Sequence, residues 1–233
     1  MVTKRGRLIV FEGGEGAGKT TQLRRSHEWL QSSDLGQQLQ ASGQVSTILL
    51  TREPGGTDVC REIRELLLHP KSVVEEIGDR TELLLYAADR AQHVEAYLKP
   101  HLEQGALILC DRFTDSTVAY QGYGRELDLP LIHQLNHIAT NGLSSDLTLW
   151  LDLDVAVGLS RTQTRGGSDR MEKNALAFHQ RVRQGFQTLA KEHPQRIIRI
   201  DATPDEDTVF GHIKTVLTQH LTEWYDPIHS GIK

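Results

Sequence analysis

The sequence predicts an α/β fold, a three-layer sandwich with a five-stranded parallel sheet and helices on both faces. Two observations lead to this prediction. Short apolar runs rich in β-branched residues alternate with longer amphipathic segments, as in a parallel sheet whose two faces are covered by helices. Polar and glycine-rich motifs follow several of these runs directly, which is where parallel sheets bind their ligands.

The elements follow from this alternation. The expected strands are Leu8–Phe11, Val45–Leu50, Ala106–Cys110, Leu147–Leu151 and Arg196–Ile200. The expected helices are Thr20–Leu30, Asp58–Leu68, Asp79–Leu102, Pro130–Thr140, Val155–Arg165, Met171–Glu192 and Asp205–Leu221. The Gln/Ser/Gly-rich residues 32–44 lack an apolar period and are expected to form a surface loop, and the tail after Leu221 is expected to be poorly ordered.

Composition limits the class of protein. The chain has 233 residues, which fits a single domain spanning residues 1–233. A formal net charge of −5 argues against a general nucleic-acid binder. The two cysteines, Cys60 and Cys110, support neither a disulfide framework nor a zinc site. No apolar run is long enough for a membrane span or a signal-peptide core, so we expect a cytoplasmic protein without a membrane partner.

A glycine-rich loop follows the first strand. Its pattern is Gly-x-x-x-x-Gly-Lys-Thr, from Gly13 to Thr20, and the next helix begins at its end. The glycines let backbone N–H groups point at phosphate oxygens, Lys19 would reach the β- and γ-phosphates, and the Thr20 hydroxyl would bind Mg²⁺. The loop therefore predicts a P-loop NTPase-type fold that binds ATP through Gly13, Gly14, Glu15, Gly16, Ala17, Gly18, Lys19, Thr20 and Thr21.

The loop by itself leaves GTPase, motor ATPase and kinase open. The Asn-Lys-x-Asp segment with which GTPases read guanine is absent from the sequence. Motor ATPases end a strand in adjacent acids, whereas Asp152 and Asp154 alternate with apolar residues. We interpret these two aspartates as strand-end and capping residues in preference to metal ligands.

Three further segments indicate a second phosphorylated ligand. Arg52 follows the second strand within Thr-Arg-Glu-Pro-Gly-Gly-Thr, where an arginine can clamp a phosphate, although a surface pair with Glu53 is the alternative. Asp111 and Arg112 follow the third strand, placed to hold Mg²⁺ through water and to neutralise the transferred phosphate; a helix cap is the alternative for Asp111. Residues 161–171 contain a glycine pair and Arg161, Arg165 and Arg170, which suits a lid or else a solvated basic turn.

These motifs, in this order, resemble the thymidylate kinase family over roughly residues 5–222. The segments that carry the resemblance are Phe-Glu-Gly-Gly-Glu-Gly-Ala-Gly-Lys-Thr-Thr at residues 11–21, Thr-Arg-Glu-Pro-Gly-Gly-Thr at 51–57, Leu-Tyr-Ala-Ala-Asp-Arg at 85–90 and Asp-Arg-Phe-Thr-Asp-Ser-Thr-Val-Ala-Tyr-Gln at 111–121. The resemblance implies phosphorylation of dTMP to dTDP with ATP and Mg²⁺, in dTTP biosynthesis. It also implies a homodimer, in which the apolar faces of Asp79–Leu102 and Pro130–Thr140 would pair.

The resemblance assigns an acceptor site residue by residue. Tyr86 stands where the family usually has a phenylalanine that stacks on thymine, and Arg90 matches an arginine that hydrogen-bonds thymine O4. Tyr120 matches an aromatic residue that disfavours ribonucleotides at the sugar. The implied dTMP site comprises Glu15, Arg52, Tyr86, Arg90, Arg112, Thr117, Tyr120 and Gln121, with Thr20 and Asp111 on the metal.

The family splits by the position of its catalytic arginine. Some members place it in the phosphate loop, where this chain has Gly16, so the resemblance assigns the charge to the lid. Gln163 stands at a lid position that is often basic in the family. The expected catalytic residues are Lys19, Arg112, Arg161, Arg165 and Arg170.

Two alternatives remain open at this point. One is another nucleoside or nucleotide kinase on the same fold, for example one that acts on deoxynucleosides. The other is a nucleotide-sensing or scaffold protein without turnover, against which the complete set Lys19, Thr20, Asp111 and Arg112 argues.

Overall fold

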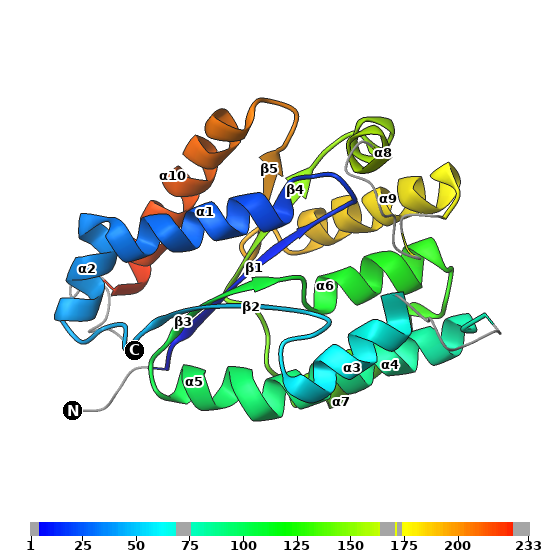
Figure 1. The fold of residues 1–233 in the computed structure, drawn as a ribbon, viewed down its shortest axis with the longest axis horizontal. Helices are drawn as coiled ribbons and strands as arrows, with labels where there is room; N and C mark the ends of the chain where they lie inside the picture. The colour runs from blue at the N-terminus through cyan, green and yellow to red at the C-terminus, as the bar shows by residue number, and fades with distance from the viewer. Residues whose placement is uncertain (1–4, 69–75, 164–170, 172–173, 226–233) are drawn as a thin grey trace.

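The structure, a computed structural model, describes residues 5–68, 76–163, 171 and 174–225. Its centre is a five-stranded parallel sheet with the strand order β2-β3-β1-β4-β5 (Figure 1). The strands are β1 Arg7–Gly13, β2 Ile48–Arg52, β3 Leu107–Asp111, β4 Leu147–Asp152 and β5 Ile197–Asp201. All five predicted strands are confirmed, and β2 starts three residues later than predicted.

Both faces of the sheet are buried because alternate side chains of each strand enter different cores. Ile9 and Phe11 of β1 belong to the core on one face. Leu8 and Val10 belong to the core on the other face. This arrangement explains why the strands read as continuous apolar runs rather than as an alternation of apolar and polar residues.

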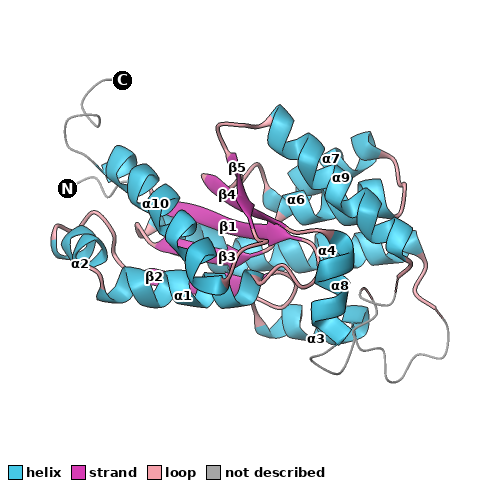
Figure 2. Cartoon of the chain, turned by 90° about the horizontal axis from the view of Figure 1, so that it is seen from above, coloured by secondary structure: helices cyan, strands magenta, loops and turns pink. Residues whose placement is uncertain are grey.

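Helices cover both faces, as predicted for a three-layer sandwich (Figures 1 and 2). One face is covered by α1 Lys19–Ser32, α2 Asp34–Ala41 and α10 Glu206–Tyr225. Against the other face and its second core lie α3 Asp58–Leu68, α4 Asp79–His93, η1 Val94–Leu98, α5 Lys99–Glu103, α6 Thr114–Thr117, η2 Val118–Gly124, α7 Leu129–Thr140 and α9 Leu176–Glu192. The remaining helix, α8 Val155–Gln163, follows β4.

Three predictions about helices need correction. The segment predicted as a surface loop contains α2, because Ser33 caps it by accepting from Gly36 N at 3.3 Å and Leu39 buries its side chain. The segment Thr114–Gly124 is helical although no period predicted it, and it continues from α6 into a π-helical turn. The helix predicted to end at Leu221 continues to Tyr225, whose ring is buried.

Other boundaries differ in detail. The helix predicted over Asp79–Leu102 runs through α4, η1 and α5 as consecutive segments, with a π-helical turn in the middle. The helix predicted from Met171 begins at Leu176. The helix predicted to Arg165 is described as far as Gln163, and residues 164–170 lie outside the described part of the chain.

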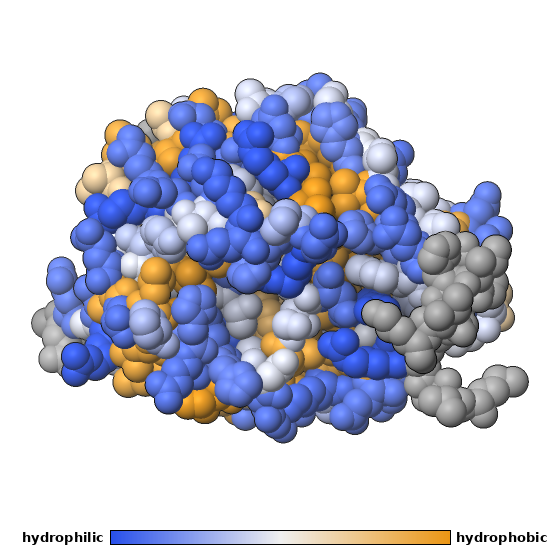
Figure 3. All heavy atoms as spheres, turned by 180° about the vertical axis from the view of Figure 1, so that it is seen from behind, coloured by the Kyte–Doolittle hydropathy of each residue, from blue (hydrophilic) through white to orange (hydrophobic). Residues whose placement is uncertain are grey.

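The molecular surface is mainly polar on the face shown in Figure 3, with hydrophobic residues in separate areas. Within the described ranges, no helix has both the length and the apolar character needed to span a bilayer.

Candidate functional site

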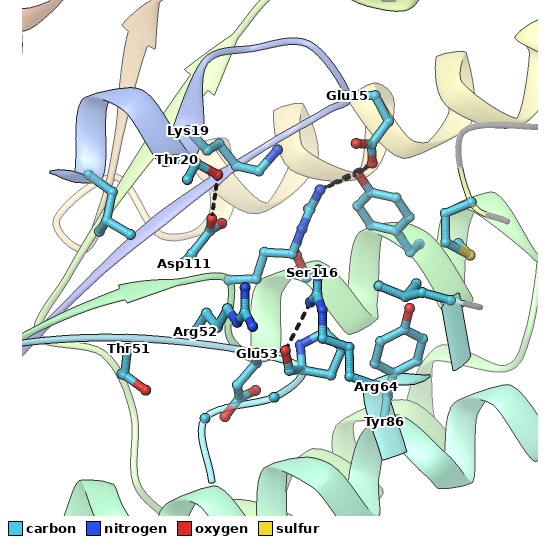
Figure 4. Close-up of a pocket in the computed structure, with 18 of the residues that line it drawn as sticks. Glu15, Lys19, Thr20, Thr51, Arg52, Glu53, Arg64, Tyr86, Asp111 and Ser116 are labelled. Carbon is cyan, nitrogen blue, oxygen red and sulfur yellow. Dashed lines mark hydrogen bonds and ion pairs between the residues drawn. The ribbon is translucent and has the colours of Figure 1, made fainter. Parts of the chain in front are cut away.

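The carboxyl ends of β1, β2 and β3 meet around one cavity of about 580 Å³. This is the position that an open parallel sheet provides for ligands. Of the residues expected at a site, the cavity brings together Glu15, Gly16, Ala17, Gly18, Lys19, Thr20, Arg52, Tyr86, Arg90, Asp111, Arg112, Thr117, Tyr120 and Gln121. Residues predicted to bind two different ligands therefore face a common space (Figure 4).

The phosphate loop has the backbone that its glycines predict. Gly16 and Gly18 have φ angles of 68° and 83°, in the left-handed region that favours glycine. The first helical residue of α1 is Lys19, so the N–H groups of its first turn are available to an anion. Lys19 donates from Nζ to Gly14 O at 2.8 Å and is largely buried. Burial, together with the charge of Arg112, lowers the pKa of Lys19, as expected for a cation that waits for an anionic partner.

Thr20 and Asp111 lie together at one side of the cavity (Figure 4). Thr20 donates from Oγ1 to Asp111 Oδ2 at 3.0 Å. The other carboxylate oxygen, Asp111 Oδ1, is buried and has no hydrogen-bond partner in the described structure. A buried carboxylate oxygen without a partner is unfavourable unless a cation or water completes it. One carboxylate and one hydroxyl, with phosphate oxygens and water, fit the ligand set of Mg²⁺.

Arg112 connects the phosphate loop to the acceptor side. Its φ is 69°, and its guanidinium donates to Gly13 O, Ser116 Oγ, Glu15 Oε1 and Tyr120 OH at 3.0–3.1 Å. Tyr120 also donates to Glu15 Oε1 at 2.6 Å. Burial opposes ionisation of Glu15, but the charges of Arg112 and Lys19 outweigh it and lower its pKa to about 2. Glu15 is therefore a charged anchor at neutral pH.

Arg90 is held by a buried network. Its Nε donates to Glu53 Oε2 at 2.9 Å, and its terminal nitrogens donate to Thr117 Oγ1, Asn136 Oδ1 and Phe113 O at 2.7–2.9 Å. These four contacts use four of its five N–H donors, and Arg90 also lines the cavity. The same-face pairing of Arg90 with Tyr86, predicted from their spacing of four residues, places both on the cavity wall.

Glu53 is the centre of that network. It accepts from Arg90 through Oε2, and its Oε1 lies 2.9 Å from His93 Nδ1. His93 Nε2 in turn lies 2.8 Å from Thr51 Oγ1. The side chain of Glu53 is 3% exposed. The alternative in which Arg52 and Glu53 form a surface pair is therefore wrong, because Glu53 is buried against a different arginine.

Gln121 has a fixed orientation. Its Nε2 donates to Glu82 Oε1 at 2.9 Å, and Glu82 also accepts from Arg125 Nη2 at 3.1 Å. Glu82 is fully buried, and a carboxylate paired with an arginine only accepts hydrogen bonds. The amide of Gln121 must then present its NH₂ group to Glu82, and Gln121 also lines the cavity.

Sequence reasoning missed Arg64. This residue of α3 lines the cavity, donates to Pro54 O at 2.9 Å and lies against Gly55, as does Arg52 (Figure 4). Burial and the charge of Arg52 lower the pKa of Arg64, so an anion between the two arginines relieves both effects. The signal in the sequence is helical spacing: Arg64 shares a face with Cys60 and Leu67, which are buried, and an arginine on an apolar face needs a partner.

Glu12 was also missed. It is fully buried beneath the loop and accepts from Phe113 N at 2.8 Å and from Ser116 Oγ at 2.6 Å. Burial raises its pKa to about 7 in spite of the nearby Arg112 charge. Its carboxyl group links the end of β1 to Phe113 and Ser116, the segment that directly follows Arg112.

The remaining predicted residues have mixed outcomes. Asp154 caps α8 by accepting from Ala156 N at 3.0 Å, and Asp152 pairs with Arg183 and Arg199, which confirms their structural interpretation. Arg161 is exposed on α8 and does not line the cavity, and neither do Gly13, Gly14 and Thr21. Arg165 and Arg170 lie outside the described residues, as does the side chain of Gln163. Among the described residues, no group of three or more His, Cys, Asp or Glu residues is placed to hold a metal.

Comparisons with known proteins agree with one another. A family model for thymidylate kinase matches residues 11–213. A thymidylate kinase from Acaryochloris marina is 58% identical, over 94% of this chain and 99% of its own. One from Cyanothece sp. is 57% identical, over 96% and 98%. The crystal structure of a thymidylate kinase from Ehrlichia chaffeensis superimposes with a TM-score of 0.71 at 34% sequence identity. The superposition covers 92% of this chain and 99% of the Ehrlichia chain.

Proposed function

This chain belongs to the thymidylate kinase family, and on that premise we propose that it transfers the γ-phosphoryl group of ATP to dTMP, giving dTDP for dTTP synthesis. The main support is the common cavity. The phosphate loop forms one side of it, and arginines together with an aromatic and an amide side chain form the other side. In-line transfer needs both phosphates in one water-poor space.

On the donor side, the loop amides and Lys19 bind the β- and γ-phosphates. Thr20 and Asp111 would hold Mg²⁺, and the partnerless Asp111 Oδ1 supports this assignment. The metal, when bound, neutralises the charge that develops on the transferred group.

On the acceptor side, Arg52 and Arg64 flank Gly55 and bind the phosphate of dTMP. Arg112 lies between donor and acceptor, since it contacts Gly13 of the phosphate loop and Tyr120 of η2. The attacking oxygen is already anionic at neutral pH, because the second pKa of a phosphate monoester is about 6. No side chain is therefore needed as a general base.

The base is read at its hydrogen-bonding edge. Thymine presents an acceptor at O4 and a donor at N3, whereas cytosine presents a donor at N4 and an acceptor at N3. The remaining donor of Arg90 and the carbonyl oxygen of Gln121 complement thymine and oppose cytosine. Tyr86 stacks on the thymine ring, and Thr117 faces the same ring. Tyr120 and Glu15 contact the deoxyribose.

The lid supplies the positive charge that the phosphate loop lacks at Gly16. Arg161 is the described member of this set, and Arg165 and Arg170 are the others. Replacement of such an arginine would cost about 10³–10⁵ in turnover, the range known for arginine fingers.

A substrate panel tests the proposal. Release of ADP from ATP and Mg²⁺ is measured with dTMP, dUMP, dCMP and thymidine as acceptors. We expect the highest kcat/KM with dTMP. A preference for thymidine would make the chain a nucleoside kinase, and nucleotide binding without ADP release would make it a sensor; either result contradicts the proposal.

We also propose that the protein is a cytoplasmic homodimer. Cys60 and Cys110 are both free and buried, which suits a reducing compartment. Leu84 of α4 and Leu131 and Ile138 of α7 are 42–66% exposed, and burial of such side chains favours association. Light scattering should give twice the chain mass for the wild type and a lower mass for Ile138→Glu; a monomeric wild type would refute the dimer.

A further inference from the structure

Two glycines far apart in the sequence meet backbone to backbone. Gly16 lies in the phosphate loop, and Gly158 lies in α8. A Cβ atom added to Gly16 would lie 2.1 Å from Gly158 O, and one added to Gly158 would lie 2.3 Å from Glu15 O. Both obstacles are backbone atoms, which cannot rotate out of the way as a side chain can. Neither position therefore accepts a side chain unless the loop or the helix moves.

The N-terminus of α8, the helix that makes this contact, is capped by a side chain. Asp154 accepts from Ala156 N and Val157 N through its side chain, and its carbonyl accepts from Gly158 N at 2.9 Å. Gly158 is buried, while its neighbours Ala156 and Val157 are exposed, so the buried face of this turn is the one that meets the loop.

Arg161 lies three residues after Gly158 on α8. Residues with this spacing are neighbours on a helix surface, so the exposed Arg161 stands at the edge of the α8 face that meets the phosphate loop. The distance from the loop to the turn that carries Arg161 is consequently set by how closely the backbone of Gly158 approaches that of residues 15 and 16.

We propose that Gly158 is a positioning residue for phosphoryl transfer: its missing side chain lets α8 pack directly on the phosphate loop, and this contact sets the place of Arg161. The inference rests on the proposed function, in which Arg161 supplies charge. It also gives Gly16 a physical role, because the backbone of α8 occupies the space that a side chain at position 16 would need.

The test is Gly158→Ala with Gly211→Ala as its matched control. Both glycines lie inside helices, but a Cβ atom at Gly211 meets nothing within 4 Å. Alanine raises helix propensity at both positions, by about 1 kcal/mol. We expect Gly158→Ala to stay folded and to lose kcat about tenfold to a hundredfold, the cost of displacing a catalytic group by an ångström. The KM for dTMP should change less than kcat, because Glu15 is the one acceptor-site residue that belongs to the loop which α8 contacts.

A double-mutant cycle with Arg161→Ala identifies what Gly158 positions. If Gly158 acts through Arg161, adding Gly158→Ala to Arg161→Ala lowers kcat by less than about threefold. Wild-type kcat in Gly158→Ala, or its full effect in the Arg161→Ala background, would overturn the inference. Neither result would contradict the proposed function as long as the wild type phosphorylates dTMP. Failure of the inference about Gly158 can therefore be told apart from failure of the proposed function.

Discussion

The donor and acceptor halves of the cavity are built in opposite ways. The donor half is a contiguous run, residues 13–20, and its working groups are mainly backbone amides with one lysine. The acceptor half collects side chains from β2, α3, α4 and η2, and holds them in place with buried charges such as Glu53 and Glu82. We therefore expect function and stability to be separable on the donor side and coupled on the acceptor side.

The largest expected effect is on the donor side. Lys19→Met should lower kcat by about 10³-fold or more, because the charge on the transferred phosphate loses its partner. Unfolding in urea should show no loss of stability, since burial already disfavours the charged lysine. Lys191→Met, at an exposed helix end, is the control and should change neither kcat nor the free energy of unfolding. A large loss of stability in Lys19→Met would break the proposed separation.

The acceptor side should behave differently. Glu53→Gln leaves the buried guanidinium of Arg90 without its anion and should cost about 3–5 kcal/mol in the free energy of unfolding, as well as activity. Glu65→Gln, an exposed residue of α3, serves as the matched control. If denaturant titration shows that both variants have the stability of the wild type, the acceptor half does not depend on its buried charges.

A smaller effect should appear in base selection. Glu82→Gln frees the amide of Gln121 to turn, because a glutamine at position 82 both donates and accepts. The ratio of kcat/KM for dTMP to that for dCMP should fall about tenfold to a hundredfold, the cost of one mispaired buried hydrogen bond.

Asp152→Asn is the control for this change, since it also removes a buried, arginine-paired carboxylate but lies outside the cavity. It should leave the ratio unchanged. A parallel loss on both substrates in Glu82→Gln would mean that Glu82 contributes only to stability.

The last expected effect is a pH dependence of stability. The pKa of Glu15 is about 2 in the folded protein and near 4.5 when unfolded. Because the pKa is lower in the folded protein, ionised Glu15 stabilises the fold at pH values above the unfolded-state pKa. This contribution is lost as pH falls from about 4.5 towards 2. Glu15→Gln should therefore flatten the decline of stability in that window, measured by urea unfolding at several pH values. An unchanged slope would show that Glu15 is not held by Arg112 and Lys19.

The same contrast explains how much could be predicted from the sequence. The phosphate loop and the five strands are local patterns, so their positions were predicted to within a few residues. The π-helical turn Val118–Gly124 was not predicted, because its π-helical geometry departs from the 3.6-residue period that identifies an α-helix. Likewise, α2 depends on one capping serine and a few buried contacts in a polar segment.

Within the site, the residues that sequence reasoning missed act through the tertiary structure. The sequence suggests an ion pair between Glu53 and its neighbour Arg52, but Glu53 pairs with Arg90, which is 37 residues away. Glu12 directly follows the predicted strand Leu8–Phe11, and Arg64 lies inside a predicted helix; in both places the sequence shows only a charged residue beside apolar neighbours. The contact of Gly16 with Gly158 leaves no trace in local sequence, because it requires two elements to meet.

Phosphoryl transfer to dTMP is tested most directly by identifying the products. The protein is incubated with ATP, Mg²⁺ and dTMP, and the nucleotides are separated and quantified over time. We expect dTDP and ADP to appear in equal amounts, and ATP to be stable when dTMP is left out. Formation of ADP without dTDP would contradict this expectation, because the two halves of the cavity would then not deliver the phosphoryl group to dTMP.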